Sequence, residues 1–161
     1  MTRLLLVCAA NLCRSPMAEA VLRLRAAELG LTEVNSAGVF ASSRAQPVDK
    51  RALAVLEQRG YGIDRRWRSR RVRPEDFDRH DLILAMDRNV LRGLRAMRPA
   101  VSPARLGLFL AGMTGLGLGL DEVPDPYYGA GNGFVHVLDL IEARVHTWPR
   151  DDEIFHKSAA G

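Results

Sequence analysis

The sequence predicts a single α/β domain built on a doubly wound parallel sheet with helices on both faces. Short apolar runs of strand length alternate along the chain with longer segments of helical periodicity, an order typical of parallel sheets. A chain of 161 residues corresponds to one domain and is long enough to bury a core. Neither an internal repeat nor a long linker divides it. We therefore expect one domain over residues 1–161, with residues 150–161 forming a loose C-terminal tail.

The predicted elements follow from the apolar runs and from the residues that bound them. A first strand is expected over residues 3–8, where consecutive apolar side chains indicate a fully buried strand. The helix that follows, over residues 15–30, begins with Ser15 as a suitable N-cap and Pro16 at the first helical position, and it ends at Gly30. Further strands are predicted at about 33–37, 82–86 and 104–110, and further helices at about 48–60, 87–97 and 134–146.

The junction between the first strand and the first helix carries the strongest chemical signal. Cys8 ends the strand, five residues follow it, and Arg14 and Ser15 then open the helix. The N-terminus of a helix presents backbone N–H groups and positive potential, which bind anions. An arginine at this spacing can hold two phosphoryl oxygens in a bidentate fork, and such surroundings favour thiolate over thiol. We predict a phosphate cradle around a nucleophilic Cys8, with Ser15 hydrogen-bonded to the sulfur.

Two simpler interpretations of this segment compete with the cradle. A cysteine that ends an apolar strand is commonly an inert core residue, but the spacing of Cys8 to Arg14 and the Ser-Pro helix start favour chemistry. An export signal that ends at Cys8 is excluded because the apolar stretch is too short. Two cysteines cannot make a disulfide framework, and no membrane segment is evident, so we expect a cytoplasmic protein.

Two motifs near opposite ends of the chain resemble those of one known protein family. Residues 7–20 (Val-Cys-Ala-Ala-Asn-Leu-Cys-Arg-Ser-Pro-Met-Ala-Glu-Ala) resemble the opening signature of the low-molecular-weight protein tyrosine phosphatases, and residues 123–129 resemble their general-acid loop. Residues 35–38 and 81–87 are similar to two further landmarks of that family. The resemblance spans nearly the whole chain and implies the strand order 2-1-3-4. It also implies a metal-independent enzyme that needs no cofactor.

The resemblance assigns a role to each site residue. Cys8 would attack the phosphorus of a phosphomonoester, and Asp125 would give a proton to the leaving oxygen and later activate water on the phosphocysteine. The phosphate oxygens would be bound by the side chain of Arg14 and by the loop residues Ala9, Ala10, Asn11, Leu12, Cys13, Arg14 and Ser15. The supporting residues would be Asn11, Ser15, Ser36, Phe40, Tyr127 and Tyr128.

Two residues of the loop raise separate expectations. The family usually has glycine where Ala10 stands, and alanine resists a positive φ, so we expect strain there. Asn11 tolerates a left-handed backbone and is expected to brace the loop. Cys13 either packs in the core or serves as a redox partner that forms a disulfide with Cys8 on mild oxidation.

The resemblance also suggests the binding partners. The expected substrate is a protein that carries phosphotyrosine, a tyrosine kinase included, and phosphate or another oxyanion is expected in the cradle. Phe40 is a candidate for stacking on the substrate ring, and Leu12, where related arginine phosphatases tend to have threonine, favours tyrosine. A phosphoarginine phosphatase and a weakly catalytic phosphate-binding or redox-sensing module remain alternatives. An arsenate reductase is disfavoured because no cysteine follows Cys13.

Three further features have simple explanations. The arginine-rich run at residues 65–73 and the net charge of +4 suggest nucleic acid, but a solvated loop that attracts anionic substrates explains them better. The glycines at residues 110–120 fit no nucleotide-binding pattern and indicate a flexible connector to Asp125. The histidines have no metal-ligand spacing, and no membrane contact is expected.

Overall fold

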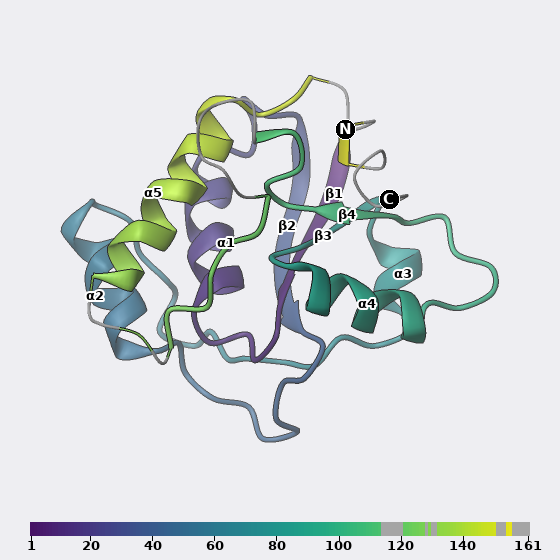
Figure 1. Ribbon diagram of the computed structural model, residues 1–161, viewed down its shortest axis with the longest axis horizontal. Coiled ribbons are helices and arrows are strands. Elements are labelled where there is room, and N and C mark those ends of the chain that lie inside the picture. The colour runs from purple at the N-terminus through teal and green to yellow at the C-terminus, as the bar shows by residue number, and fades with distance from the viewer. Residues whose placement is uncertain (114–120, 128, 130–131, 151–153, 156–161) are drawn as a thin grey trace.

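The computed structural model describes residues 1–113, 121–127, 129, 132–150 and 154–155. Its centre is a parallel sheet of four strands in the order β2-β1-β3-β4, as expected (Figure 1). The strands are β1 (Thr2–Cys8), β2 (Leu31–Gly38), β3 (Leu82–Ala85) and β4 (Arg105–Leu108). The helices are α1 (Arg14–Leu24), α2 (Lys50–Gln58), α3 (Asp76–Arg79), α4 (Arg88–Met97) and α5 (Gly133–His146).

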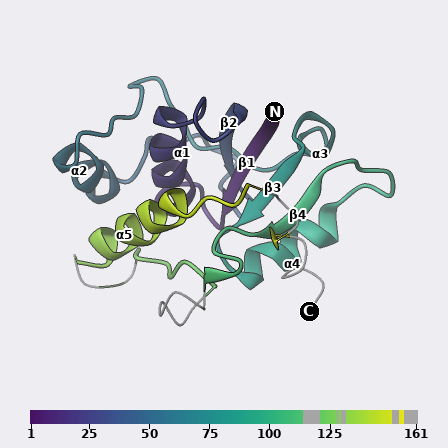
Figure 2. The same ribbon diagram turned by 90° about the horizontal axis from the view of Figure 1, so that it is seen from above.

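Helices cover both faces of the sheet. Figures 1 and 2 show α1 and α5 on one face, with α2 packed outside them, and α3 and α4 on the other. The central strand β1 is therefore buried on both sides, and residues 4–7 of it have no exposed surface. This is the burial that a continuous apolar run predicts for the middle of a parallel sheet.

The structure corrects one predicted helix and adds another that was not predicted. The first helix begins at Arg14 rather than Ser15, and the hydroxyl of Ser15 is directed to the Cys8 sulfur instead of capping the helix. It ends at Leu24 and gives way to turns that run to Gly30, whose φ of 71° suits only glycine well. The short helix α3 was not predicted, because four residues carry no readable periodicity.

The C-terminal segment is anchored at the two residues described there. Phe155 is 1% exposed and packs over β4, where a Cβ on Gly107 would lie 2.3 Å from the Phe155 carbonyl oxygen. A Cβ on Gly112 would likewise clash with the side chain of Ile154. The expectation of a loose tail therefore does not hold for Ile154 and Phe155, because two glycines leave room for them against the sheet; residues 156–161 lie outside the described part of the chain.

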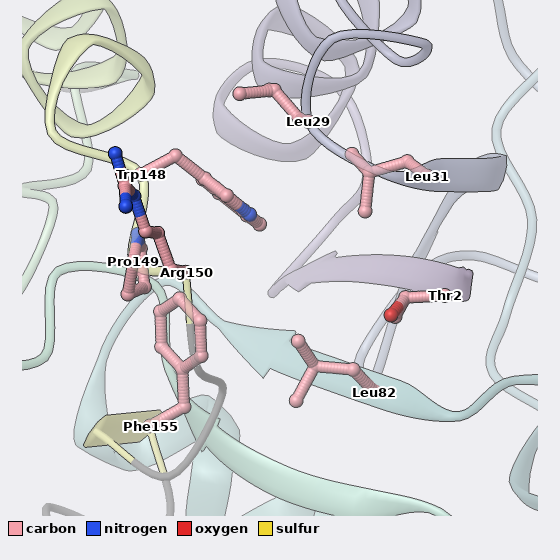
Figure 3. A pocket seen from close by; sticks show the side chains of 8 residues that line it. All are labelled: Thr2, Leu29, Leu31, Leu82, Trp148, Pro149, Arg150 and Phe155. Atoms are coloured by element: carbon pink, nitrogen blue, oxygen red, sulfur yellow. The ribbon is translucent and has the colours of Figure 1, made fainter.

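A cavity of about 380 Å³ opens at the amino ends of the strands. Trp148 and Phe155 face Leu31 and Leu82 across it (Figure 3). The residues with the predicted chemistry lie at the opposite, carboxyl edge, where Cys8 at the end of β1 pairs with Gly38 at the end of β2. Ligands of open parallel sheets bind at that edge. No helix within the described residues has the length and apolarity to cross a membrane.

Candidate active site

The loop between β1 and α1 curls around the sulfur of Cys8. The backbone N–H of Asn11 donates to Cys8 Sγ at 3.3 Å, and Ser15 Oγ lies 3.0 Å from the same atom. Cys8 is 3% exposed and both cysteines are free thiols. The sulfur of Cys8 is therefore in contact with polar groups of Asn11 and Ser15, both from the segment that leads into α1.

Asn11 is the brace of this loop. Its φ is 58°, and among the residues that the structure describes no other residue except glycines has a positive φ. The expected strain at Ala10 is therefore absent, because the left-handed conformation falls on Asn11, which tolerates it. The buried Asn11 side chain donates through Nδ2 to Ser15 Oγ at 2.9 Å and to Ser36 Oγ at 3.0 Å, and it accepts the Arg70 N–H at 3.0 Å.

Asn11 is connected through Ser36 to a buried carboxylate that the sequence analysis did not single out. Glu19, on α1, is 5% exposed and accepts hydrogen bonds from Ser36 Oγ and, at 3.2 Å, from Trp67 Nε1. Arg23 completes the set with an ion pair at 3.1 Å. The Glu19 carboxylate thus orients the Ser36 hydroxyl, which in turn accepts from Asn11. The resemblance implied a supporting role for Ser36, and these contacts show that Ser36 connects Asn11 to Glu19.

Gly38 allows the loop to lie against the end of β2. A Cβ on Gly38 would approach Ala9 O to 2.6 Å and Asn11 N to 2.9 Å, distances that real side chains do not reach. In addition, the Gly38 N–H donates to Arg70 O at 2.9 Å, which connects β2 to the arginine-rich loop at residues 65–73. The absence of a side chain at this one position therefore sets the path of the phosphate loop.

Arg14 is fixed by partners far away in the chain. Its Nη1 donates to Asp87 Oδ2 at 2.6 Å and to the carbonyl oxygen of Val123 at 2.9 Å. Asp87 is also the N-cap of α4, where its Oδ1 accepts the Val90 N–H at 2.8 Å. Burial opposes the charge of Arg14, but the Cys8 sulfur, Asp87 and Asp125 outweigh it and raise the pKa of the guanidinium. Arg14 therefore stays charged and has a defined orientation.

The two motifs from opposite ends of the chain meet in one cavity of about 420 Å³. The residues that line it are Cys8, Ala9, Ala10, Leu12, Cys13, Arg14, Asp125 and Tyr127. Asp125 Oδ2 lies 3.8 Å from Arg14 Nη2, and Asp125 Oδ1 accepts the Tyr127 N–H at 3.0 Å. The Asp125 side chain is 45% exposed, so it can reach a bound molecule.

Phe40, Tyr128 and Cys13 complete the set of expected site residues. Phe40 is exposed and stands next to Gly93 of α4. Tyr128 lies outside the described residues, as does the connector at 114–120. Cys13 borders the cavity, but burial, followed by the charges of Asp49, Cys8 and Asp125, raises the pKa of its thiol to about 12. At neutral pH Cys13 is therefore a neutral thiol.

Comparison with known proteins identifies the family. The family model of low molecular weight phosphotyrosine protein phosphatases matches residues 3–158. A low molecular weight protein-tyrosine-phosphatase of Streptomyces coelicolor is 40% identical over 145 residues, which cover 88% of this chain and 87% of the relative. The crystal structure of a phosphatase from Vibrio cholerae O395 superposes with a TM-score of 0.78 at 37% identity and covers 92% of this chain and 97% of the other.

An arginine phosphatase of Drosophila has the same fold, with a TM-score of 0.72 at 26% identity over 92% of this chain and 99% of the other. The family model and the Streptomyces relative each extend over most of this chain, and both motifs fall within residues 3–158, which the family model matches. The chain is a member of the low molecular weight protein-tyrosine-phosphatase family.

Proposed function

We propose that the chain hydrolyses phosphotyrosine on proteins through a phosphocysteine intermediate. The observation that carries this proposal is that Cys8, Arg14 and Asp125 line one cavity, with the Asn11 N–H bonded to the Cys8 sulfur. A nucleophile, an anion-binding cradle and a proton donor are the groups that the displacement of an aryl oxygen from phosphorus requires.

The first step transfers the phosphoryl group to the protein. The Cys8 thiolate attacks phosphorus, the bond from phosphorus to the tyrosine oxygen breaks, and Asp125 gives its proton to that oxygen. The loop amides and Arg14 bind the three equatorial oxygens, whose negative charge is spread in the transition state. Because Asp125 Oδ1 accepts the Tyr127 N–H, Oδ2 is the oxygen that is left to carry the proton.

The second step releases phosphate. A water molecule attacks the phosphocysteine, Asp125 takes a proton from that water, and the bond from sulfur to phosphorus breaks. The electron pair returns to Cys8 as a thiolate, which the Ser15 hydroxyl and the Asn11 N–H stabilise. Neither step calls for a metal or an organic cofactor, since the cradle supplies the positive potential.

The decisive experiment measures turnover of an aryl phosphate in the presence of a metal chelator. The wild-type protein should hydrolyse it, and Cys8→Ser should lose at least about 1,000-fold in kcat while still binding inorganic phosphate. Phosphate binding with no thiol-dependent turnover would instead support the weakly catalytic phosphate-binding or redox-sensing module.

Phosphoarginine is the second candidate substrate, because the Drosophila arginine phosphatase shares this fold. Leu12 on the cavity wall favours the planar, apolar ring of tyrosine over a charged guanidinium. Matched peptides that carry phosphotyrosine, phosphoarginine or phosphoserine separate these substrates by their kcat/KM. We expect phosphotyrosine to be preferred, with tyrosine kinases among the protein substrates.

We place the activity in the cytoplasm, where reducing conditions keep Cys8 as a thiol.

A further inference from the structure

We infer that Arg51, on α2, is a positioning residue for the general acid Asp125, which it reaches through the backbone of Tyr127. The inference rests on the proposed function, since it takes Asp125 as the proton donor. Arg51 does not line the cavity, and neither the sequence motifs nor the proposed chemistry gives it a task. Its contacts nevertheless connect the acid loop to the body of the domain.

The Arg51 guanidinium bonds the acid loop directly. Its Nη1 donates to the carbonyl oxygen of Tyr127 at 3.2 Å. The guanidinium carbon of Arg51, Cζ, lies 5.2 Å from the centre of the Tyr127 ring and 4.7 Å from the centre of the Phe134 ring on α5. A guanidinium at these distances is attracted to the face of an aromatic ring. Arg51 thus contacts both the backbone and the side chain of Tyr127, and it ties that residue to the first turns of α5.

Tyr127 passes this restraint to the acid. Its N–H donates to Asp125 Oδ1 at 3.0 Å, while its carbonyl accepts from Arg51. The other described contact of the Asp125 carboxylate is with Arg14 at 3.8 Å, too long for a hydrogen bond. The orientation of a half-exposed carboxyl group therefore depends on where the Tyr127 backbone is held.

The opposite end of this connection is the phosphate loop. Asp49, the N-cap of α2, accepts from Arg51 Nη2 at 2.9 Å and from Arg51 Nε at 3.2 Å. The Asp49 N–H in turn donates to the carbonyl oxygen of Leu12 at 2.9 Å. The series Leu12, Asp49, Arg51, Tyr127 and Asp125 therefore spans the mouth of the cavity from the cradle to the acid. It sets the distance between the leaving oxygen and its proton donor, which a cradle alone cannot do.

A double-mutant cycle on kcat/KM tests this inference, because kcat/KM for a phosphomonoester reports transfer to Cys8. The four proteins are wild type, Arg51→Ala, Asp125→Ala and the double variant, and the substrate is phenyl phosphate, whose leaving group needs a proton. Misplacing the acid should lower kcat/KM by about tenfold when Arg51→Ala is made in the wild type. The same substitution should change kcat/KM by less than about twofold in the Asp125→Ala background, where no acid remains to be positioned.

Leaving-group dependence and matched variants complete the test. With 2,4-dinitrophenyl phosphate, whose leaving group needs no proton, Arg51→Ala should have an effect below about twofold. Arg51→Lys keeps a positive charge but cannot bond Asp49 at two points while stacking on Tyr127, so it should recover little of the loss. Arg25→Ala removes another partly exposed arginine, one that pairs with Glu28 at a distance of 3.0 Å, and serves as the control with unchanged kinetics.

Three results would overturn the inference while the proposed function stands. These are an Arg51→Ala enzyme as active as the wild type, an equal loss of kcat/KM in both backgrounds, and full rescue by Arg51→Lys, which would mean that charge alone acts on the substrate. A wild-type protein without thiol-dependent turnover would defeat the proposed function itself. If Arg51→Ala should fail to fold, Arg51→Lys carries the same cycle, with the loss again confined to the background that contains Asp125.

Discussion

The hydroxyl oxygen of Ser15 lies 3.0 Å from the sulfur of Cys8. Asn11 Nδ2 donates to the same hydroxyl at 2.9 Å, and the Ser15 proton can be directed either at the sulfur or, over a longer distance of 3.4 Å, at the carbonyl oxygen of Ala37. A hydroxyl that donates to a thiolate helps most when the sulfur carries full charge. This occurs before attack on the substrate and again when the thiolate leaves the phosphocysteine.

Ser15→Ala should therefore slow the breakdown of the phosphocysteine more than its formation. A hydrogen bond to a charged group contributes about 1.5–3 kcal/mol, so kcat should fall by about 10- to 100-fold. Rapid-quench measurement on p-nitrophenyl phosphate should show a burst of nitrophenol followed by a slow steady state. A variant with wild-type kcat and no larger burst would mean that the hydroxyl does not stabilise the leaving sulfur.

Gly38→Ala should displace the phosphate loop. The added Cβ would meet Ala9 O at 2.6 Å and Asn11 N at 2.9 Å, and both atoms belong to the backbone that forms the cradle. We expect a stability loss of about 1–3 kcal/mol from the overpacking and a fall in kcat/KM of about 100-fold. The inhibition constant of inorganic phosphate should rise in parallel, because the same N–H groups bind it.

Gly62→Ala is the matched control for this substitution. A Cβ there would have no atom within 4 Å, so kinetics and stability should stay close to wild type. A Gly38→Ala enzyme that binds phosphate as tightly as the wild type would show that the loop can shift without losing its donors.

The buried carboxyl group of Asp76 predicts how the stability of the fold depends on pH. Burial opposes its charge, but hydrogen bonds from the Arg70 guanidinium and the Arg73 N–H outweigh burial and lower the pKa of the Asp76 carboxyl. A carboxyl whose pKa is lower in the folded state than in the unfolded state stabilises the fold above its unfolded pKa, and this contribution is lost as the pH falls through the folded pKa. Asp76→Asn should thus cost about 1–3 kcal/mol at pH 7 and less near pH 3, which lies below the ordinary pKa of an aspartate.

Urea unfolding at the two pH values measures this difference. Asp64→Asn is the control, because Asp64 also has a lowered pKa, caused by the Arg66 N–H, but lies exposed at the surface. It should leave the unfolding midpoint unchanged at both pH values. An Asp76→Asn cost that is the same at pH 3 and pH 7 would mean that charge pairing with Arg70 is not its source.

The local parts of the site could be predicted from sequence, and the distant parts could not. Cys8, Arg14 and Ser15 are linked by a spacing of a few residues, so a strand, a turn and a helix start place them together. Arg14 and Asp87 are 73 residues apart, and their 2.6 Å contact depends on how β3 and α4 pack beside β1. Periodicity shows which face of an element is buried but not which buried residues touch.

The same reasoning explains the two corrections near the site. The predicted N-cap role of Ser15 is wrong, since the helix begins one residue earlier, whereas the predicted contact of its hydroxyl with the Cys8 sulfur is present. The alanine at position 10 suggested strain, yet the positive φ lies at Asn11. Glu19 and Trp67 were missed because their bond joins residues 48 positions apart. The only signal was a glutamate on the apolar side of α1.

Oxidation of the two cysteines provides the last prediction. Hydrogen peroxide would convert the Cys8 thiolate to a sulfenic acid, and the sulfur of Cys13 would then attack that sulfur, releasing water and closing a disulfide. Because burial raises the pKa of Cys13 to about 12, little thiolate is present at neutral pH and closure should be slow. The disulfide should therefore form in competition with further oxidation of Cys8 to the sulfinic acid, and its share should increase with pH.

Peptide mass analysis after brief peroxide treatment at pH 6, 7.5 and 9 measures that share. The expected result is a Cys8 to Cys13 link that grows with pH and restores activity on reduction. Cys13→Ser keeps the side-chain size but removes the attacking sulfur, so the same treatment should leave activity that reductant recovers poorly. If wild type and Cys13→Ser lose and regain activity equally at every pH, Cys13 is a packed core residue, because a sulfur that never attacks the sulfenic acid cannot protect the nucleophile.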